Sequence, residues 1–194
     1  TDPRRPASPD TTGVRGARID IGHVAVFRSL VHAAKIGPEP EAELFEALQR
    51  KDIPALRALT KKLDAKTRAA LMLLPELYGG AEVIDIAARK LPNLPALRKA
   101  LATLRTLARD CSVPASFDLA ELRGYHYHSG VVFDAYCDGP NGNGAVLIAP
   151  GGRYDEVGKA FARLRPATGF SIGLRELAGA ARIAPWSVKK AKHK

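Results

Sequence analysis

The spacing of hydrophobic residues changes once along the chain, and this change constrains the fold more than any other feature. Between residues 40 and 110, leucine and alanine recur every three or four positions, which is the period of amphipathic helices. After Pro114 the apolar residues alternate or form short β-branched and aromatic runs, as in residues 131–136. A helical segment followed by a strand-rich segment predicts an α+β fold.

Five segments follow from this pattern. Residues 1–18 hold prolines, glycines and arginines with little to bury, and predict a disordered arm. Residues 19–36 begin as a short alternating strand and continue as an amphipathic helix. Residues 37–115 predict an all-helical insertion with short connections. Residues 116–182 predict an antiparallel sheet with helices against it, and residues 183–194 a basic tail.

Turn residues divide the strand-rich segment into separate strands. Residues 117–122 alternate and predict a strand, and residues 138–144 (Asp-Gly-Pro-Asn-Gly-Asn-Gly) are typical of a hairpin turn between two further strands. Sequential strands joined by short turns form an antiparallel meander. We expect a helix at 154–161, another strand at 168–172 and a closing helix at 174–181.

Composition limits the class of protein. With 46% hydrophobic residues in 194, the chain should be globular. No run approaches the apolar length of a membrane span, and no hydrophobic segment follows the N-terminal arm. A disulfide between Cys111 and Cys137 is possible, but two cysteines in a chain of this size are more often free thiols. These features predict a soluble cytoplasmic protein with no membrane contact.

The formal net charge of +10 raises nucleic acid as a partner. Much of this charge lies at the two ends: the tail holds four lysines, and residues 1–18 hold four arginines against two aspartates. Short basic ends are usually solvated. A nucleic-acid interface is therefore the weaker interpretation, although the charge pattern leaves it open.

A cluster of rings points to a small polar ligand. Residues 122–136 read Leu-Arg-Gly-Tyr-His-Tyr-His-Ser-Gly-Val-Val-Phe-Asp-Ala-Tyr, and four of the five tyrosines lie between residues 125 and 154. Rings and a guanidinium on adjacent strands can stack on a ligand and hydrogen-bond to it. The alternative is ordinary strand packing, with a surface arginine. Gly151 and Gly152 could form only a turn, or could let the backbone approach a ligand closely.

A metal site is the alternative to a ligand pocket in this segment. His126 and His128 share a strand parity, so both imidazoles could reach one zinc ion. A third ligand is not evident, because Asp134 or Asp155 would have to be recruited by folding. We therefore predict no metal.

Three ordered motifs carry a family resemblance. Residues 123–134, 151–155 and 169–174 resemble the two histidine-specific motifs and motif 3 of class II aminoacyl-tRNA synthetases of the histidyl type. Within this group, residues 122–133 and 19–28 are most similar to the non-catalytic regulatory subunits of ATP phosphoribosyltransferase. The resemblance implies the second half of a class II synthetase-like core, with the helical insertion inside it.

The resemblance also implies a histidine-binding site. It makes Arg123 the cation that faces the ligand, and it puts Tyr127 and His128 on the wall that contacts the imidazole, with Tyr154 closing the pocket. The six expected site residues are Arg123, Tyr127, His128, Gly151, Gly152 and Tyr154.

Motif 3 departs from the synthetase pattern. Synthetases of this class end it with Gly-Leu-Glu-Arg, whereas this chain has Gly-Leu-Arg-Glu, ending at Arg175 and Glu176. A carboxylate at 176 repels the phosphates that an arginine would hold. Arg175 is turned by about 100° around the helix from that position. We therefore expect neither catalytic residues nor a cofactor, with a histidyl-tRNA synthetase-like enzyme fragment as the alternative.

The resemblance extends from residue 19 to about residue 186 and implies partners. Regulatory subunits of this kind assemble with short-form catalytic subunits of ATP phosphoribosyltransferase and report histidine levels in the first step of histidine biosynthesis, which is allostery between two polypeptides. The motif 1 and motif 2 segments of the family are not found ahead of Ile19. We therefore expect a fragment or truncated chain with one unpaired sheet edge and a half-open pocket.

Overall fold

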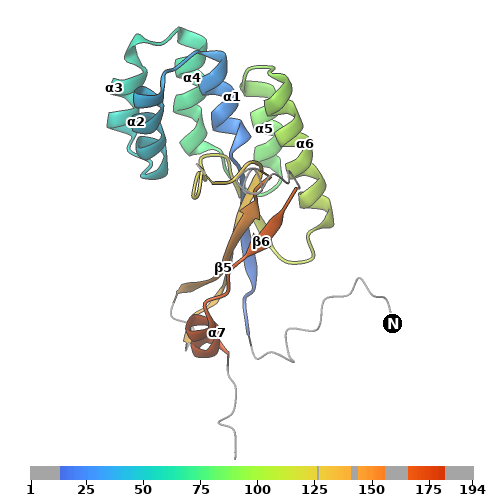
Figure 1. Cartoon of the computed structure of the whole chain (residues 1–194). Helices are drawn as coiled ribbons and strands as arrows, with labels where there is room; N and C mark the ends of the chain where they lie inside the picture. Colours follow the sequence, from blue (N-terminus) through green and yellow to red (C-terminus); the bar gives the residue numbers. More distant parts are fainter. Residues whose placement is uncertain (1–13, 126, 141–143, 156–165, 182–194) are drawn as a thin grey trace, which may run out of the picture.

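The computed structural model describes residues 14–125, 127–140, 144–155 and 166–181. A six-stranded sheet extends away from a group of helices gathered at one of its ends (Figure 1). Most of the expected arm, the basic tail, His126 and most of the expected helix at 154–161 lie outside the described residues.

The first strand leads directly into the first helix. Strand β1 (Arg18–His23) alternates between the two faces of the sheet, and α1 (Ala25–Ala33) follows it. The buried side of α1 includes Phe27, which has no exposed surface. The helix ends before Lys35, whose φ of 52° lies in the left-handed region.

Five more helices form a group with α1, which we call the helical block (α1 to α6). Leucines at helical spacing fill its core: Leu48, Leu56 and Leu104 are fully buried. Asp52 and Asp64 cap α3 and α4 by accepting backbone N–H hydrogen bonds. The helices are α2 (Pro38–Gln49), α3 (Ile53–Leu59), α4 (Ala65–Leu73), α5 (Glu82–Lys90) and α6 (Pro95–Asp110), with 3-10 turns at Thr60–Lys62 and Leu74–Glu76.

One short strand interrupts the segment expected to be all-helical. Strand β2 (Tyr78–Gly79) pairs antiparallel with β3 (Ala115–Asp118). The backbone N–H of Leu119 donates to the carbonyl of Leu77 at 3.0 Å and extends this contact. Gly79, with a φ of 155°, breaks the helical path here, so the chain reaches the sheet edge before α5 begins.

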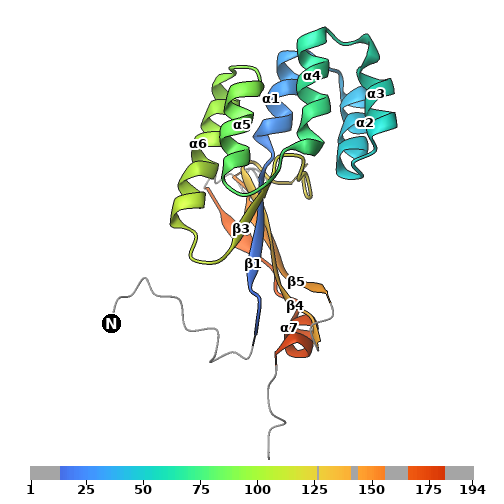
Figure 2. The ribbon, with the colours of Figure 1, turned by 180° about the vertical axis from the view of Figure 1, so that it is seen from behind.

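The sheet is mixed, which corrects the expectation of a wholly antiparallel one. Strands β4 to β6 form the predicted antiparallel meander, but β1 and β3 run parallel, as Figure 2 shows from behind. The helical block is long enough to carry the chain back to the start of the sheet, so β3 can take the direction of β1. The α+β class is confirmed. The remaining strands are β4 (Val131–Asp138), β5 (Ala145–Arg153) and β6 (Thr168–Phe170), and the sheet order is β2-β3-β1-β4-β5-β6.

Strand β3 is shorter than the strand expected at 117–122. It ends at Asp118, whose carboxylate accepts the backbone N–H of Ala120 at 2.9 Å and turns the chain. The connection from residue 119 to residue 130, which we call the 119–130 loop, then returns to β4. Helix α7 (Leu174–Ala180) closes the described part of the chain.

The two faces of the sheet differ in chemistry. Ile19, Ile21 and Phe133 share the face toward α6, where they line an apolar groove of about 430 Å³. Asp20 pairs with Asp134 in the register of β1 with β4, so these carboxylates share the opposite face. We call that side, with Ser116 and Tyr136, the polar face.

In the described part of the chain, none of the helices is long and apolar enough to cross a membrane. Cys111 and Cys137 are both free thiols, as predicted.

Candidate functional site

The polar face brings together side chains from three adjacent strands. Asp20 on β1 lies between Ser116 on β3 and Asp134 on β4 in the strand register. The Ser116 hydroxyl donates a short hydrogen bond to Asp20. The hydroxyl of Tyr136 donates to Asp134 at 3.5 Å. Alternation along the strands produces this cluster, because residues two apart point to the same side.

Arg123 reaches this face from the 119–130 loop. Its guanidinium forms an ion pair with Asp134 and a longer contact of 3.4 Å with Glu121. The Glu121 carboxylate also accepts the Arg123 backbone N–H at 2.8 Å. About half of the Arg123 side chain stays exposed (52%), while the Asp134 side chain is buried (5%). Arg123, which was predicted to face a ligand, is therefore held at the polar face by two carboxylates.

Burial and charge shift the pKa values of this cluster. Burial raises the pKa of Asp134, and Arg123 only partly offsets that effect. Burial likewise raises the pKa of Glu121. Burial acts to lower the pKa of Arg123, but the carboxylates of Glu121 and Asp134 outweigh it and leave that pKa above its usual value. Arg123 therefore favours the ionised form of both carboxyls.

The His128 ring is wedged between two glycines. A Cβ atom at Gly152 would lie 2.7 Å from His128 Nδ1, and one at Gly124 would lie 2.6 Å from its Cδ2. Among the described residues, Nδ1 is buried and makes no hydrogen bond. Burial lowers the pKa of His128, which favours the neutral imidazole. His128 therefore lies in the predicted wall, with glycine on each side of its ring.

Two tyrosines extend this wall. The rings of Tyr127 and Tyr154 lie 5.3 Å apart, and the His128 ring lies 5.7 Å from the first and 5.8 Å from the second. Tyr127 is 57% exposed, so its ring is accessible to a partner or ligand. The structure therefore gathers the three predicted rings into one cluster.

Gly151 and Gly152 allow close approach of protein groups. A Cβ at Gly151 would lie 2.6 Å from the carbonyl oxygen of Gly169 on β6, and one at Gly152 would lie 2.7 Å from the carbonyl oxygen of Val131. Larger residues would push apart the neighbouring strands or the His128 ring. Gly151 also lines the small cavity beside Arg123.

That cavity has a volume of about 90 Å³. Small-molecule sites usually measure about 300 to 1,000 Å³. The cavity is therefore smaller than a usual small-molecule site. Its lining comes from the 119–130 loop, β4 and β5: Glu121, Arg123, Gly124, His128, Val132, Phe133, Asp134, Pro150 and Gly151.

One tyrosine of the sequence cluster belongs to the core instead. Tyr125 is 3% exposed, and its hydroxyl donates to Glu41 at 2.6 Å. Its ring contacts Phe27, and the guanidinium of Arg28 lies 4.7 Å from the ring centroid. Burial raises the pKa of Tyr125 to about 12. Tyr125 therefore holds the 119–130 loop against the helical block.

The metal alternative gains no support from the described residues, which contain no group of three or more potential ligands. Asp155 forms an ion pair with Arg153 at 2.9 Å, and Asp134 is engaged by Arg123. His126, the other half of the predicted pair, lies outside the described residues.

Arg175 and Glu176 lie on α7, toward the other end of β5. Both are exposed. A Cβ at Gly173 would lie 2.3 Å from the Glu176 carboxylate, so this side chain folds back over the residue that precedes the helix. A carboxylate in the first helical turn also interacts favourably with the helix dipole. The Glu176 side chain therefore lies back against the N-terminal end of α7.

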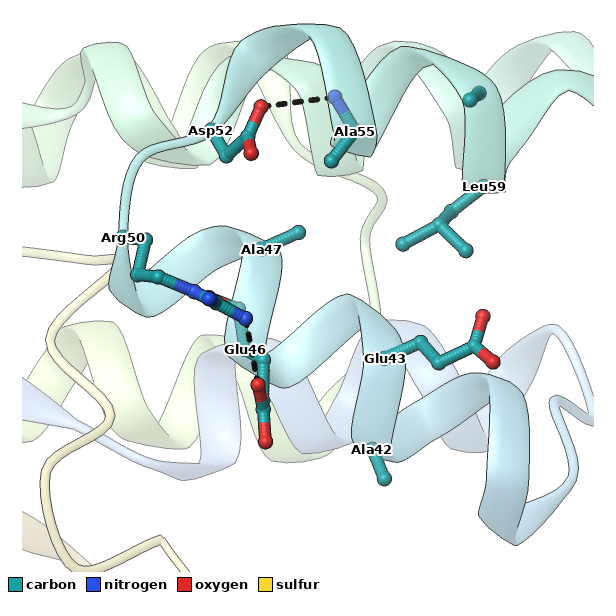
Figure 3. Close-up of a pocket in the computed structure, with 9 residues that line it drawn as sticks. Ala42, Glu43, Glu46, Ala47, Arg50, Asp52, Ala55 and Leu59 are labelled. Atoms are coloured by element: carbon teal, nitrogen blue, oxygen red, sulfur yellow. Dashed lines mark hydrogen bonds and ion pairs between the residues drawn. The ribbon is translucent and has the colours of Figure 1, made fainter.

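A larger open pocket of about 500 Å³ lies between α2 and α3 (Figure 3). Alanines line much of it, and three of its four charged residues already have partners: Arg50 pairs with Glu46 at 2.6 Å, and Asp52 caps α3. It offers no ring and no buried ionisable group, so we place the site on the polar face.

Sequence reasoning missed the residues beneath Arg123. From the sequence, Asp134 is only a possible metal ligand. Asp20, Ser116 and Glu121 have no predicted role. The alternating pattern of the strands could have identified two of these residues, Asp20 and Asp134. Asp20 stands between two isoleucines, and Asp134 follows an apolar run at an alternating position, so each could have been assigned to the polar side of its strand.

Comparison with known proteins places this geometry in a family. A family model described as histidyl-tRNA synthetase matches residues 7–177. The chain belongs to the histidyl-tRNA synthetase family. The model covers both the helical block and the polar face.

Individual proteins related to this family are similar to the chain in sequence or in structure. The ATP phosphoribosyltransferase regulatory subunit of Azoarcus sp. strain BH72 is 55% identical over 166 residues, which are 85% of this chain and 42% of that protein. An ATP phosphoribosyltransferase regulatory subunit/histidyl-tRNA synthetase from Bacillus halodurans has a similar structure, with a TM-score of 0.71 and 28% identity over 87% of this chain and 45% of that one. A chain of the ATP phosphoribosyl transferase (HisG:HisZ) complex from Thermotoga maritima shares the fold, with a TM-score of 0.60 and 18% identity over 85% of this chain and 56% of that one. The chain spans about half the length of the curated relatives it matches, as with the Azoarcus protein.

Proposed function

We propose that this chain is the histidine-sensing part of an ATP phosphoribosyltransferase regulatory subunit. The observation that carries the proposal is that Arg123 and His128 line one cavity on the polar face, and that the Tyr154 ring lies beside the His128 ring. A guanidinium suits a carboxylate, and neutral rings suit an imidazole. The identity of 55% to a regulatory subunit supports the same assignment.

The proposed ligand site consists of the six residues expected from the sequence. Arg123 would bind the carboxylate of histidine, and Tyr127, His128 and Tyr154 would surround its imidazole. Gly151 and Gly152 would keep β5 close to the ring wall.

We further propose that the subunit has no catalysis of its own. Glu176 stands where a synthetase of this class has a phosphate-binding arginine, and its carboxylate folds back over Gly173. A carboxylate at this place disfavours bound ATP phosphates. Activation of an amino acid by ATP is therefore not expected, and no cofactor is required.

The proposed partner is the short-form catalytic subunit, in a hetero-oligomer located in the cytoplasm. The related fold in the Thermotoga maritima complex supports such an assembly. Histidine would then act as an allosteric effector, by binding one arrangement of the complex more tightly than another.

The test is a calorimetric titration of the full-length protein with histidine, for the wild type and for Arg123→Ala. We expect Arg123→Ala to weaken binding by about 1.5 to 3 kcal/mol, the usual contribution of a charge-assisted hydrogen bond. Arg109→Ala is the matched control, because Arg109 is an exposed arginine on α6, away from the polar face.

Two results would contradict the proposal. Equal histidine affinity in a folded Arg123→Ala protein would remove the site from this face. Histidine-dependent exchange between ATP and pyrophosphate, well above a control without protein, would favour the synthetase alternative.

A further inference from the structure

The buried carboxylate of Asp134 holds the guanidinium of Arg123 in an ion pair. Asp134 is 4% exposed, and its Oδ2 pairs with a terminal nitrogen of Arg123. An ionised carboxylate is costly to bury, and the usual compensation is a charge partner with further hydrogen bonds. Asp134 has both, because Arg123 pairs with it and Tyr136 donates to it at 3.5 Å.

We propose that Asp134 is a positioning residue, which fixes the Arg123 guanidinium at the cavity so that its remaining N–H groups meet the carboxylate of an amino-acid ligand. This inference rests on the proposed function and deepens it, since it names the group that makes Arg123 selective. Asp134 itself does not contact the ligand.

The backbone around the two residues explains why positioning is needed. Arg123 lies on the 119–130 loop, outside the strands, and half of its long side chain is exposed. Such a side chain loses much rotamer freedom when it binds a ligand, unless another group already holds it. Asp134 lies in the middle of β4, paired with Asp20 on β1 and Pro150 on β5. It can therefore act as a rigid anchor.

Glu121 cannot replace Asp134 in this role. It belongs to the same loop as Arg123, two residues away, and would move with it. Its contact with the guanidinium is the longer one, at 3.4 Å. Asp20 is the other nearby carboxylate, and it already accepts a hydrogen bond from Ser116. Asp134 is therefore the acceptor that links the loop to the sheet.

The donors of Arg123 leave room for a ligand. A guanidinium has five N–H groups in a planar fork, which matches a carboxylate in two-point contact. Asp134 and Glu121 each contact one terminal nitrogen and Tyr136 also interacts with the guanidinium, so two of the five N–H groups remain. Because Arg123 also lines the cavity, a ligand bound there can reach them. The ligand class that fits is a free amino acid with its carboxylate intact.

The experiment compares two ligands on the full-length protein by calorimetry. Histidine has the carboxylate, and histamine has the same imidazole and amine but lacks it. We expect Asp134→Asn to weaken histidine at least tenfold and to leave histamine within twofold. In an Arg123→Ala background, adding Asp134→Asn should cause little further loss, because a residue that acts through Arg123 has no effect without it.

Asp138→Asn is the matched control, because it makes the same change at an exposed position of β4, in an ion pair with Arg18 at 3.3 Å. Equal losses for histidine and histamine in Asp134→Asn, or additive losses in the double variant, would overturn the positioning role. If Asp134→Asn fails to fold, Asp134→Glu replaces it. The longer side chain keeps the charge but displaces the guanidinium, so we expect at least a threefold loss for histidine alone, and unchanged affinity for histidine would overturn the role.

The two proposals fail in different ways. A wild-type protein that does not bind histidine would overturn the proposed function and this role with it. A wild-type protein that binds histidine, with unchanged affinity in Asp134→Asn, would remove the positioning role alone.

Discussion

The helical block and the polar face of the sheet use charge in opposite ways. In the helical block the buried residues are almost all apolar, and charged pairs such as Arg105 with Asp85 lie at the surface. On the polar face Asp134 is buried and bound to Arg123. Exposed pairs contribute little to stability, whereas a buried pair adds specificity at a cost in desolvation. The apolar burial of the helical block therefore stabilises the chain, and the polar face carries the buried ion pair that we propose selects a ligand.

The comparison predicts that the largest stability effects belong to the helical block. Leu104 on α6 is fully buried, so Leu104→Ala should destabilise the protein by about 2 to 5 kcal/mol, the usual range for such a cavity. Urea denaturation of the full-length protein measures this. Histidine affinity of the folded variant should stay within twofold of the wild type. A large loss of affinity at equal folding would show that the two regions are energetically coupled.

The second prediction concerns His23, at the junction of the two regions. Its Nδ1 accepts the backbone N–H of Ala25 at 3.2 Å, and burial, with Arg153 and Arg28 nearby, lowers its pKa to about 4. A histidine with a lowered folded pKa contributes its full stability above its unfolded pKa of about 6.5, and this is lost as the pH falls toward 4.

We expect a loss of about 3 kcal/mol across that window, since each pKa unit is worth about 1.4 kcal/mol. Denaturation midpoints between pH 7 and pH 4 measure it, with His23→Gln as the comparison, because glutamine does not titrate. An identical pH profile for both proteins would assign the acid sensitivity to other groups.

The smallest expected effect lies on the sheet. Gly152→Ala places a Cβ against His128 and the Val131 carbonyl, and should cost about 1 to 3 kcal/mol of stability. It should also weaken histidine binding, because the His128 ring must move. Gly179→Ala on α7 is the control, since a Cβ there meets nothing within 4 Å. Equal stability and affinity in the two variants would mean that the His128 ring adapts freely.

Much of the fold could be predicted because helices and hairpins are encoded locally. The spacing of Leu56, Leu59 and Leu63, and the cap at Asp64, can be recognised without knowledge of the partner elements. The pairing of β1 with β3 could not be predicted from local sequence. It depends on the position at which the chain leaves the helical block and re-enters the sheet. Strand β2 was missed for the same reason, since two residues at Tyr78–Gly79 carry no period.

The site could be predicted only in part. The resemblance supplied Arg123 and the ring wall. In the structure Arg123 and His128 line one cavity, and the rings of Tyr127 and Tyr154 lie beside His128. Neither periodicity nor resemblance identified Asp134 as the anchor of Arg123. That ion pair joins a loop to a strand, and its partners are set by the curvature and register of the sheet.

The parallel pairing of β1 with β3 also has a kinetic consequence. The two strands are neighbours, but the entire helical block lies between them in the chain. If about 90 intervening residues were an open loop, bringing its ends together would cost about 4 kcal/mol in chain entropy before any strand hydrogen bond formed. Helices form earlier, from contacts close in sequence, and a condensed block holds its two ends nearer to each other. Asp20, Ser116 and Asp134 meet only where β1, β3 and β4 pair, so we expect this cluster on the polar face to assemble late in folding.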